Sequence, residues 1–190
     1  MNLQPLTTPP TLWTIGHSTR SREDFLALLS AHGITQLIDV RRYPGSRRYP
    51  HFHSDALKKN LADAGLVYRH LPDLGGRRPA RSHSPNDGWK NASFRGYADY
   101  MQTGEFQRAL GVLTVAAVPA RTAIMCAEAV PWRCHRSLIA DALVARGWTV
   151  VHILGLTQVK SHQMTAFARI EGSRIAYPAP ADEEAPPRLF

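Results

Sequence analysis

The segment RTAIMCAEAVPWRCHRSLIADALVARGWTVVHILG, residues 121–155, contains a complete strand–helix–strand pattern. Its first eight residues, 121–128, are a largely continuous apolar run, which predicts a strand buried on both faces. Residues 134–147 carry apolar side chains at helical spacing, and residues 148–155 are again apolar and rich in β-branched side chains. Because a strand, a helix and a second strand in this order form a parallel βαβ unit, the segment predicts an α/β fold.

The same alternation extends toward the N-terminus. Residues 12–18 are predicted to form a buried strand, and residues 21–33 a helix that Ser21 caps and Gly33 ends. The other expected elements are a strand at 35–41, a helix at 53–65 that Ser54 caps and Gly65 ends, a strand at 66–72, a loop at 73–92, and two short helices within 94–118 that separate near Gly104. We therefore expect a small single α/β domain, with a mostly parallel sheet of about five strands and helices on both faces.

Composition sets the domain limits and the expected compartment. Residues 1–11 are a Pro/Thr-rich lead-in that we expect to be poorly ordered, and residues 12–156 form the α/β domain. Residues 157–190 are expected to be a partly disordered extension with a short helix at its start. No apolar run reaches the roughly 18 residues of a membrane span, the N-terminus does not resemble a signal peptide, and two cysteines are too few for a disulfide framework. These features predict a soluble, cytoplasmic protein with no membrane partner, and they leave its oligomeric state unknown.

The positive charge is concentrated in one part of the chain. Residues 41–95 hold 12 Lys/Arg and 4 Asp/Glu, a surplus of eight that equals the net charge of +8 of the whole chain. Much of it lies in two expected loops, RRYPGSRRYPHFH at 41–53 and DLGGRRPARSH at 73–83. Such a local surplus favours contact with a polyanion, so the expected partner is a phosphate-bearing ligand, nucleic acid included. The alternative is an arginine-rich surface that only keeps the protein in solution.

Polar residues follow the ends of several expected strands. The first strand ends at His17, the second at Asp39 and Arg41, and the fourth at Cys126 and Glu128. Ligands of parallel α/β sheets bind in the crevice beyond the carboxyl ends of the strands. We therefore expect these side chains to gather at one edge of the sheet, beside the basic loops.

The segment after the fourth strand offers groups for nucleophilic chemistry. Pro131 suits the first turn of a helix, which would place Cys134, His135 and Arg136 in its opening turn. The amides and the dipole at a helix N-terminus favour a bound anion or a thiolate. A cysteine at this position, beside histidine and arginine, would have a lowered pKa.

Several of these residues also have structural interpretations. His135 would point to the sheet end, where either Glu128 or His17 would partner it. Asp39 and Arg41 suit a structural ion pair as well as they suit a site. Cys126 suits the core of the domain, and Cys134 equally suits a half-buried, small apolar position.

The leading hypothesis is an enzyme, a hydrolase or group transferase, that acts on a phosphate-bearing nucleotide or nucleic acid. Glu128 would be its general base or nucleophile, with His135 exchanging protons and Arg136 stabilising negative charge. Phosphate would be held by loop arginines and bases would stack on aromatic rings; the candidates are Arg41, Arg42, Arg47, Arg48, Arg77, Arg78, Tyr43, Tyr49 and Trp89. The alternatives are a nucleic-acid-binding module without chemistry, and a thiol- or metal-dependent enzyme centred on Cys134.

The sequence requires no cofactor. It lacks the glycine-rich fingerprints of dinucleotide and ATP sites. A divalent metal is the cofactor that the residues would allow, with Cys126, Cys134 and His135 as ligands and His17 as a candidate fourth. The spacing of these residues does not match the zinc deaminase signature.

The motifs GHS, LIDVR, the Tyr-Pro/Arg loop and above all CAEAVPWRCHR resemble the family of the domain of unknown function 488, whose hallmark is Cys-x-Glu followed by Cys-His-Arg. The resemblance covers residues 12–155. It implies a compact α/β domain in which the signature positions are Cys126, Glu128, Cys134, His135 and Arg136, together with His17, Asp39 and Arg41. It implies no particular activity.

Overall fold

The protein is built on a six-stranded sheet. The computed structural model describes residues 8–172 and 174–180. The strand order is β3-β2-β4-β1-β5-β6, in which the first five strands of the chain run parallel to their neighbours and β6 pairs antiparallel with β5. The strands are β1 (Thr11–Gly16), β2 (Gln36–Asp39), β3 (Val67–His70), β4 (Thr122–Cys126), β5 (Thr149–Ile153) and β6 (Val159–Ser161). This confirms the predicted small α/β domain with a mostly parallel sheet.

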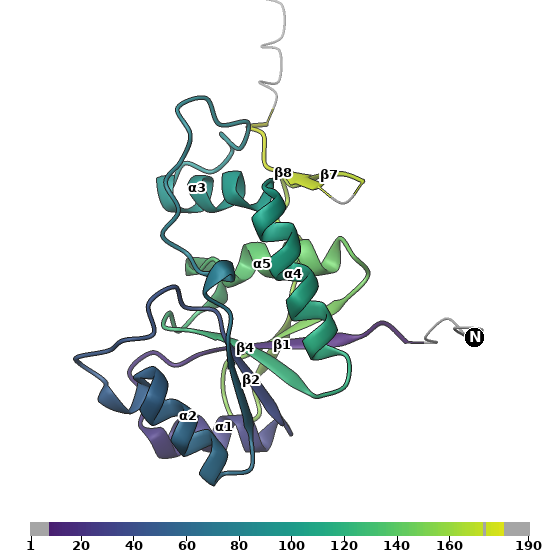
Figure 1. The fold of residues 1–190 in the computed structure, drawn as a ribbon. Coiled ribbons are helices and arrows are strands. Elements are labelled where there is room, and N and C mark those ends of the chain that lie inside the picture. The colour runs from purple at the N-terminus through teal and green to yellow at the C-terminus, as the bar shows by residue number, and fades with distance from the viewer. Residues whose placement is uncertain (1–7, 173, 181–190) are drawn as a thin grey trace, which may run out of the picture.

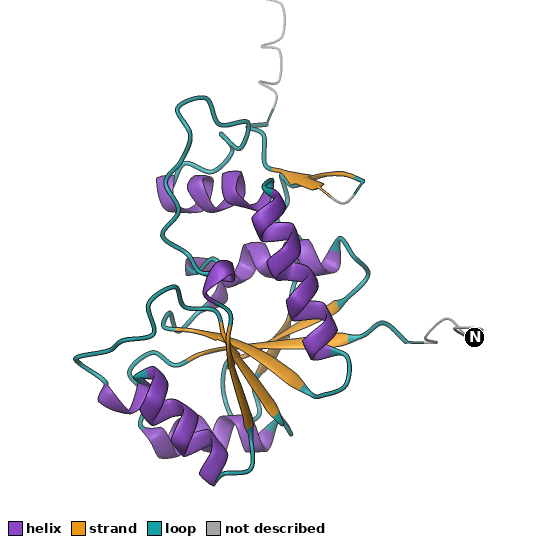
Figure 2. Ribbon diagram, in the orientation of Figure 1, coloured by secondary structure: helices purple, strands orange, loops and turns teal. Residues whose placement is uncertain are grey.

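Helices cover both faces of the sheet (Figures 1 and 2). They are α1 (Arg22–Ala31), α2 (Ser54–Asp63), α3 (Ala92–Met101), α4 (Gly104–Ala117) and α5 (Arg136–Val144), with short 3-10 turns η1 (Pro50–Phe52), η2 (Pro72–Leu74) and η3 (Pro131–Arg133). The first two helices bury their apolar side chains with Ile15, Leu37 and Met125 on one face. The other three pack on Leu12, Ile38 and other side chains of the opposite face. Alternate residues of β1, β2, β4 and β5 thus serve two cores, as expected for a sheet covered on both sides.

Local signals explain most helix limits. Ser21 Oγ accepts a hydrogen bond from the backbone N–H of Asp24 and caps α1, and Gly33 follows that helix with a φ of +61°. The prediction that Ser54 caps α2 is wrong. His53 holds the cap position with extended backbone, and Ser54 is already the first helical residue.

The chain after residue 155 differs from the expectation of a last strand at 148–155 followed by a short helix. In its described part it forms β6 on the sheet edge and a hairpin of β7 (Arg169–Glu171) and β8 (Arg174–Ala176). Tyr177 then packs into the larger core with no exposed surface. The apolar side chains of Phe167 and Ile175 pack in or against the same core. Removing these side chains from water stabilises the folded position of the hairpin. Poor order was also predicted for both ends of the chain, and in residues 1–7 and 181–190 that prediction lies outside the described residues.

No helix in the described part of the chain has both the length and the apolar character needed to cross a bilayer.

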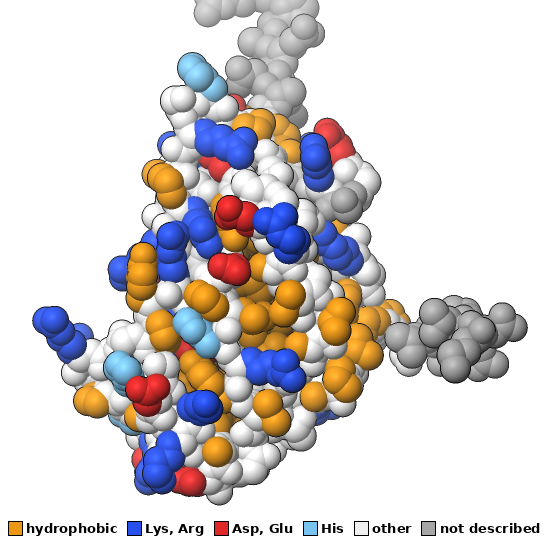
Figure 3. All heavy atoms as spheres, in the orientation of Figure 1, with side chains coloured by type: hydrophobic (Ala, Val, Ile, Leu, Met, Phe, Trp, Pro, Cys, Tyr) orange, Lys and Arg blue, Asp and Glu red, His pale blue; other side chains and the backbone are white. Residues whose placement is uncertain are grey.

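Two long basic loops extend from the carboxyl edge of the sheet. Residues 41–53 follow β2, and residues 73–91 follow β3 and lead into α3; both lie to the left in Figure 1. In Figure 3, several Lys and Arg side chains lie along that side of the surface, and others are spread over the rest of this face. The fold thus positions the charge surplus of the sequence beside the ends of the parallel strands.

Candidate functional site

A cavity of about 300 Å³ lies at the carboxyl edge of the sheet and is called here the arginine pocket. Its walls come from the two basic loops, the start of α3 and the segment that joins β4 to α5. The residues that line it are Arg41, Arg42, Tyr43, Gly76, Arg77, Ser93, Phe94, Tyr97, Cys126, Ala127, Glu128, Arg133, Cys134 and His135. This is the location that the topology of a parallel sheet favours for a ligand.

The segment after β4 turns sharply before it reaches α5. Gly16, at the end of β1, lies so close to this turn that an added Cβ would meet the Glu128 carbonyl oxygen at 1.9 Å. Pro131 begins the separate 3-10 turn η3 and not α5, and Cys134 follows it with extended backbone. His135 then holds the cap position of α5 without a capping side-chain hydrogen bond. The predicted helix start, which put Cys134 and His135 in the first helical turn, is therefore wrong.

This turn brings two sulfur atoms to one imidazole nitrogen. His135 Nδ1 lies 4.0 Å from Cys126 Sγ and 3.6 Å from Cys134 Sγ. The other ring nitrogen, Nε2, lies 3.3 Å from the carbonyl oxygen of Val40. Because a carbonyl only accepts hydrogen bonds, this contact assigns the proton to Nε2 and leaves the Nδ1 lone pair facing the sulfurs.

The two thiols are inequivalent. Burial raises the pKa of the Cys134 thiol, but the hydrogen bond from Cys126 and the charge of Arg136 outweigh this effect and bring the pKa well below its usual value. The hydrogen bond to Cys134, followed by burial, raises the pKa of Cys126 well above its usual value. The pair therefore favours a thiolate at Cys134 that accepts from the thiol of Cys126.

Arg136 places a buried cation against that sulfur. Its guanidinium is 1% exposed and donates from Nε to Cys134 Sγ, 3.4 Å away. The other nitrogens donate to the main-chain carbonyl of Glu128 and, at 3.5 Å, to Thr14 Oγ1. The contact with Glu128 is thus made through the backbone and not through its carboxylate.

Asp39 and Arg41 form a buried ion pair behind the pocket wall. Arg41 donates to both carboxylate oxygens, and the shortest contact is 2.6 Å. Tyr68 donates to the same carboxylate at 2.9 Å. Asp39 is fully buried and does not line the pocket, whereas Arg41 does. Asp39 therefore positions Arg41 in the wall.

His17 also supports Arg41 and does not line the pocket. Its ring stacks on Phe52 with centroids 4.2 Å apart, Nδ1 contacts the Ser18 carbonyl, and Nε2 lies 3.3 Å from Arg41 Nη1. Burial and then the charge of Arg41 lower the pKa of His17 to about 4. A neutral ring that accepts from Arg41 fits both contacts.

Glu128 lies at the pocket with an exposed side chain. The expected contact between Glu128 and His135 is absent from the described residues, because both ring nitrogens of His135 face the cysteines and Val40. The carboxylate is therefore free to meet a ligand in the cavity.

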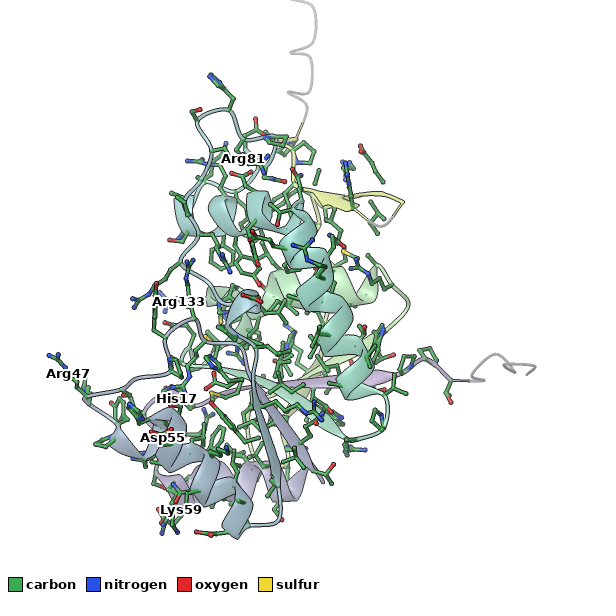
Figure 4. The ribbon with its side chains drawn as sticks, in the orientation of Figure 1. His17, Arg47, Asp55, Lys59, Arg81 and Arg133 are labelled. Carbon is green, nitrogen blue, oxygen red and sulfur yellow. The ribbon has the colours of Figure 1, made fainter. Side chains whose placement is uncertain are left out.

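The predicted phosphate-binding residues separate into two groups. Arg41, Arg42, Arg77 and Tyr43 line the pocket. The others do not: Arg47 and Arg48 are exposed on the loop, Arg78 stacks on Tyr100, Tyr49 packs against the smaller core, and Trp89 packs on Phe94 and Phe167. Figure 4 shows Arg47 at the outer tip of its loop, well apart from Arg133.

Sequence reasoning missed Arg133 and the aromatic wall made by Phe94 and Tyr97. The two aromatic residues lie three positions apart at the start of α3, directly after the basic loop. Their spacing puts them on one helix face, which is a signal that the sequence offers.

A second buried network lies behind Arg136. His162 Nε2 contacts Asp141 Oδ1 at 2.8 Å, and His162 Nδ1 contacts His152 Nε2 at 3.0 Å. His152 Nδ1 in turn contacts Thr14 Oγ1 at 2.8 Å, and that oxygen accepts from Arg136. The chain of contacts links the sulfur site to the buried carboxylate of Asp141, a later residue of α5.

Comparison with known proteins gives a family and no activity. A search of curated proteins and a search of solved structures found no match. The family model described as "Domain of unknown function DUF488" matches residues 21–143, which is more than half of the chain. This span includes Asp39 and Arg41, both cysteines, Glu128, His135 and the two basic loops. The chain therefore belongs to the family of the domain of unknown function DUF488.

Proposed function

We propose that the protein is an enzyme, a hydrolase or group transferase, that acts on a phosphate-bearing nucleotide or nucleic acid. The observation that carries this proposal is the composition of the arginine pocket. Four arginines and one glutamate line the cavity, and the Cys126–Cys134–His135 cluster lies in its wall. A concave site with such a surplus of positive charge favours an anionic ligand.

The size of the cavity supports a ligand of about one nucleotide. Small-molecule pockets occupy roughly 300–1,000 Å³, so a volume of about 300 Å³ is at the lower limit of this range. Tyr43 and Phe94 supply aromatic surface for a base. A free nucleotide, or a single unpaired nucleotide of a longer strand, fits these features better than a duplex does.

The charged pocket side chains that make no ion pair within the described part of the chain indicate how the reaction would proceed. Glu128 accepts the proton of an attacking hydroxyl group, whose oxygen bonds to the electrophilic atom while the bond to the leaving group breaks. Arg77 and Arg133 are exposed and make no ion pair within the described part of the chain, so their charges are available for the phosphate. The leaving group departs with a proton from solvent.

The test is Glu128→Gln, with Glu105→Gln as its control. Glu105 is an exposed glutamate of α4 outside the pocket. A panel of nucleoside 5′-phosphates and short single-stranded oligonucleotides is incubated with each protein, and products are separated by chromatography. We expect Glu128→Gln to bind the substrate within about twofold of the unmodified protein and to lose roughly 100-fold or more of the turnover.

Glu105→Gln should leave both properties unchanged. Equal loss of binding and turnover in Glu128→Gln would contradict the assignment of Glu128. Salt-dependent binding with no turnover across the whole panel would instead indicate a binding module.

A further inference from the structure

We propose that Cys126, Cys134 and His135 form a zinc-binding centre with one coordination position open to the arginine pocket. Their three donor atoms lie within 4.8 Å of one another. Tetrahedral zinc, with Zn–S near 2.3 Å and Zn–N near 2.0 Å, requires about 3.5 Å between sulfur and nitrogen donors. The two sulfur–nitrogen distances are 3.6 and 4.0 Å, so only small shifts separate the cluster from this geometry.

The orientation of His135 fits a ligand. A zinc-bound histidine donates its second ring N–H to a carbonyl or carboxylate, which fixes the tautomer and the ring plane. The Val40 carbonyl, 3.3 Å from Nε2, provides this partner. Nδ1 therefore presents its lone pair between the two sulfurs without any rotation of the ring.

Arg136 indicates that the cluster carries negative charge. A guanidinium that is 1% exposed is costly to bury without an anion beside it. The ion pairs in the described part of the chain do not include Arg136, and its contacts go to a hydroxyl, a carbonyl and the Cys134 sulfur. A thiolate ligand at Cys134 supplies the missing charge, and the Nε–H···S contact is the outer hydrogen bond that such ligands receive.

The space beside the donors is open toward the pocket. Gly76 of the second basic loop faces the ring, where an added Cβ would lie 2.9 Å from His135 Nδ1. The candidate fourth ligand named from the sequence, His17, is turned away toward Phe52 and Arg41. Three protein ligands with an open fourth position are typical of catalytic zinc sites, whereas structural sites use four.

The inference rests on the proposed function only for the role of the open position, which would hold water or a substrate oxygen beside Glu128. Binding of the metal itself is independent of that role. The two ideas are therefore tested by different measurements.

The experiment uses the full chain, treated with a chelator and then titrated with Co²⁺ and with Zn²⁺. We expect one metal ion per chain by elemental analysis. Bound Co²⁺ should give a thiolate-to-metal charge-transfer band in the near ultraviolet and intense visible bands typical of tetrahedral cobalt. One equivalent of Zn²⁺ should remove these bands and should protect both cysteines from iodoacetamide, whereas excess Mg²⁺ should do neither.

Cys126→Ser, Cys134→Ser and His135→Asn should each lose the charge-transfer band or weaken metal binding tenfold or more. Glu128→Gln is the matched control, because it lines the same pocket without contributing a donor, and it should bind metal normally. Protection from iodoacetamide is measured in the unmodified protein, so it remains informative if a variant fails to fold.

The inference is overturned if the reduced protein takes up no stoichiometric metal, or if both thiols react at the same rate with and without Zn²⁺. Turnover that persists in the metal-free protein would support the proposed function while contradicting a catalytic metal. Metal binding without nucleotide binding would support the zinc centre and contradict the proposed function.

Discussion

His152 Nε2 and His162 Nδ1 lie 3.0 Å apart, so a single imidazole–imidazole hydrogen bond joins strand β5 to the segment after β6. The two ends of the network fix its direction, because Arg136 only donates and the Asp141 carboxylate only accepts. Arg136 therefore donates to Thr14, Thr14 to His152, His152 to His162, and His162 to Asp141. In this arrangement every donor is matched to one acceptor, and the lowered pKa of His152 agrees with the neutral ring that it requires there.

The first prediction concerns stability in acid. Burial, followed by the charges of His162, Arg136 and Lys160, lowers the pKa of His152 to about 3. In the unfolded chain the pKa is about 6.5, so between these values the unfolded state binds the extra proton. The free energy of unfolding should therefore fall as the pH is lowered from about 6.5 toward 3. His152 should account for a loss on the order of 3 kcal/mol by about pH 4. Above about pH 6.5 its contribution should not change with pH.

Urea titrations of His152→Gln over this range measure the contribution. The variant should be less stable at neutral pH and should show a shallower pH dependence than the unmodified protein. His83→Gln, at an exposed loop position, is the control and should keep the full slope. His17, whose pKa is also lowered, retains its own share of the slope in both variants. An unchanged slope in His152→Gln would contradict the assignment.

The second prediction concerns the ion pair that positions Arg41. Asp39→Asn leaves a guanidinium that is 6% exposed without its counter-charge. Breaking a buried pair in this way costs about 3–5 kcal/mol. Asp63→Asn removes the carboxylate of the exposed pair with Lys59 and should change the free energy of unfolding by less than about 1 kcal/mol. Urea denaturation measures the free energy of unfolding of both variants. Equal losses would contradict the prediction that the Asp39–Arg41 pair contributes more to stability than the Asp63–Lys59 pair.

The third prediction concerns recognition of phosphate. Arg77→Gln removes one charge from the pocket, and Arg47→Gln removes the same charge from the loop tip outside it. Loss of a charge-assisted hydrogen bond costs about 1.5–3 kcal/mol, so Arg77→Gln should weaken binding of a nucleoside 5′-monophosphate by roughly tenfold or more. Arg47→Gln should leave this Kd within about twofold. Fluorescence titration at fixed salt concentration measures both, and similar losses would place the phosphate outside the pocket.

The fourth prediction concerns Gly76. Its Cβ in Gly76→Ala would lie 2.9 Å from His135 Nδ1, so the ring or the loop must move. Gly45→Ala is the matched control, because nothing lies within 4 Å of the added carbon there. Both variants should keep the free energy of unfolding within about 1 kcal/mol. Only Gly76→Ala should weaken Co²⁺ binding. A normal cobalt spectrum in this variant would contradict the prediction, because the loop would then have moved without displacing the donor atoms.

Local patterns of the sequence predict much of the fold. The strand–helix alternation, the cap at Ser21, the stop at Gly33 and the helix break near Gly104 all correspond to structure. These features depend on hydrophobic period and on backbone preferences, which act within a few residues. The cap of α2 at His53 differs by one residue because the extended residue before a helix, and not the best capping side chain, defines that position.

Other features depend on contacts that no local pattern reveals. Pro131 starts a 3-10 turn because the chain must pass the end of β1 at Gly16 before α5 can begin. The strands after residue 156 form because β5 offers a free sheet edge and the larger core accepts Tyr177. In the site, strand-end reasoning found the residues at the ends of β2 and β4. It expected His17 beside His135 or a metal, whereas tertiary packing places the His17 ring against Phe52 and Arg41.

The position of β1 has a practical consequence for work with fragments. Thr11–Gly16 pairs with β4 on one side and with β5 on the other, yet both it and β5 lie outside residues 21–143. A recombinant piece trimmed to the family match would lose two adjoining strands, together with the Thr14 hydroxyl that accepts from Arg136. A recombinant fragment should therefore begin before Thr11 and extend beyond Tyr177. If a shorter fragment is inactive, the missing strands explain the loss, and nothing follows about the catalytic residues.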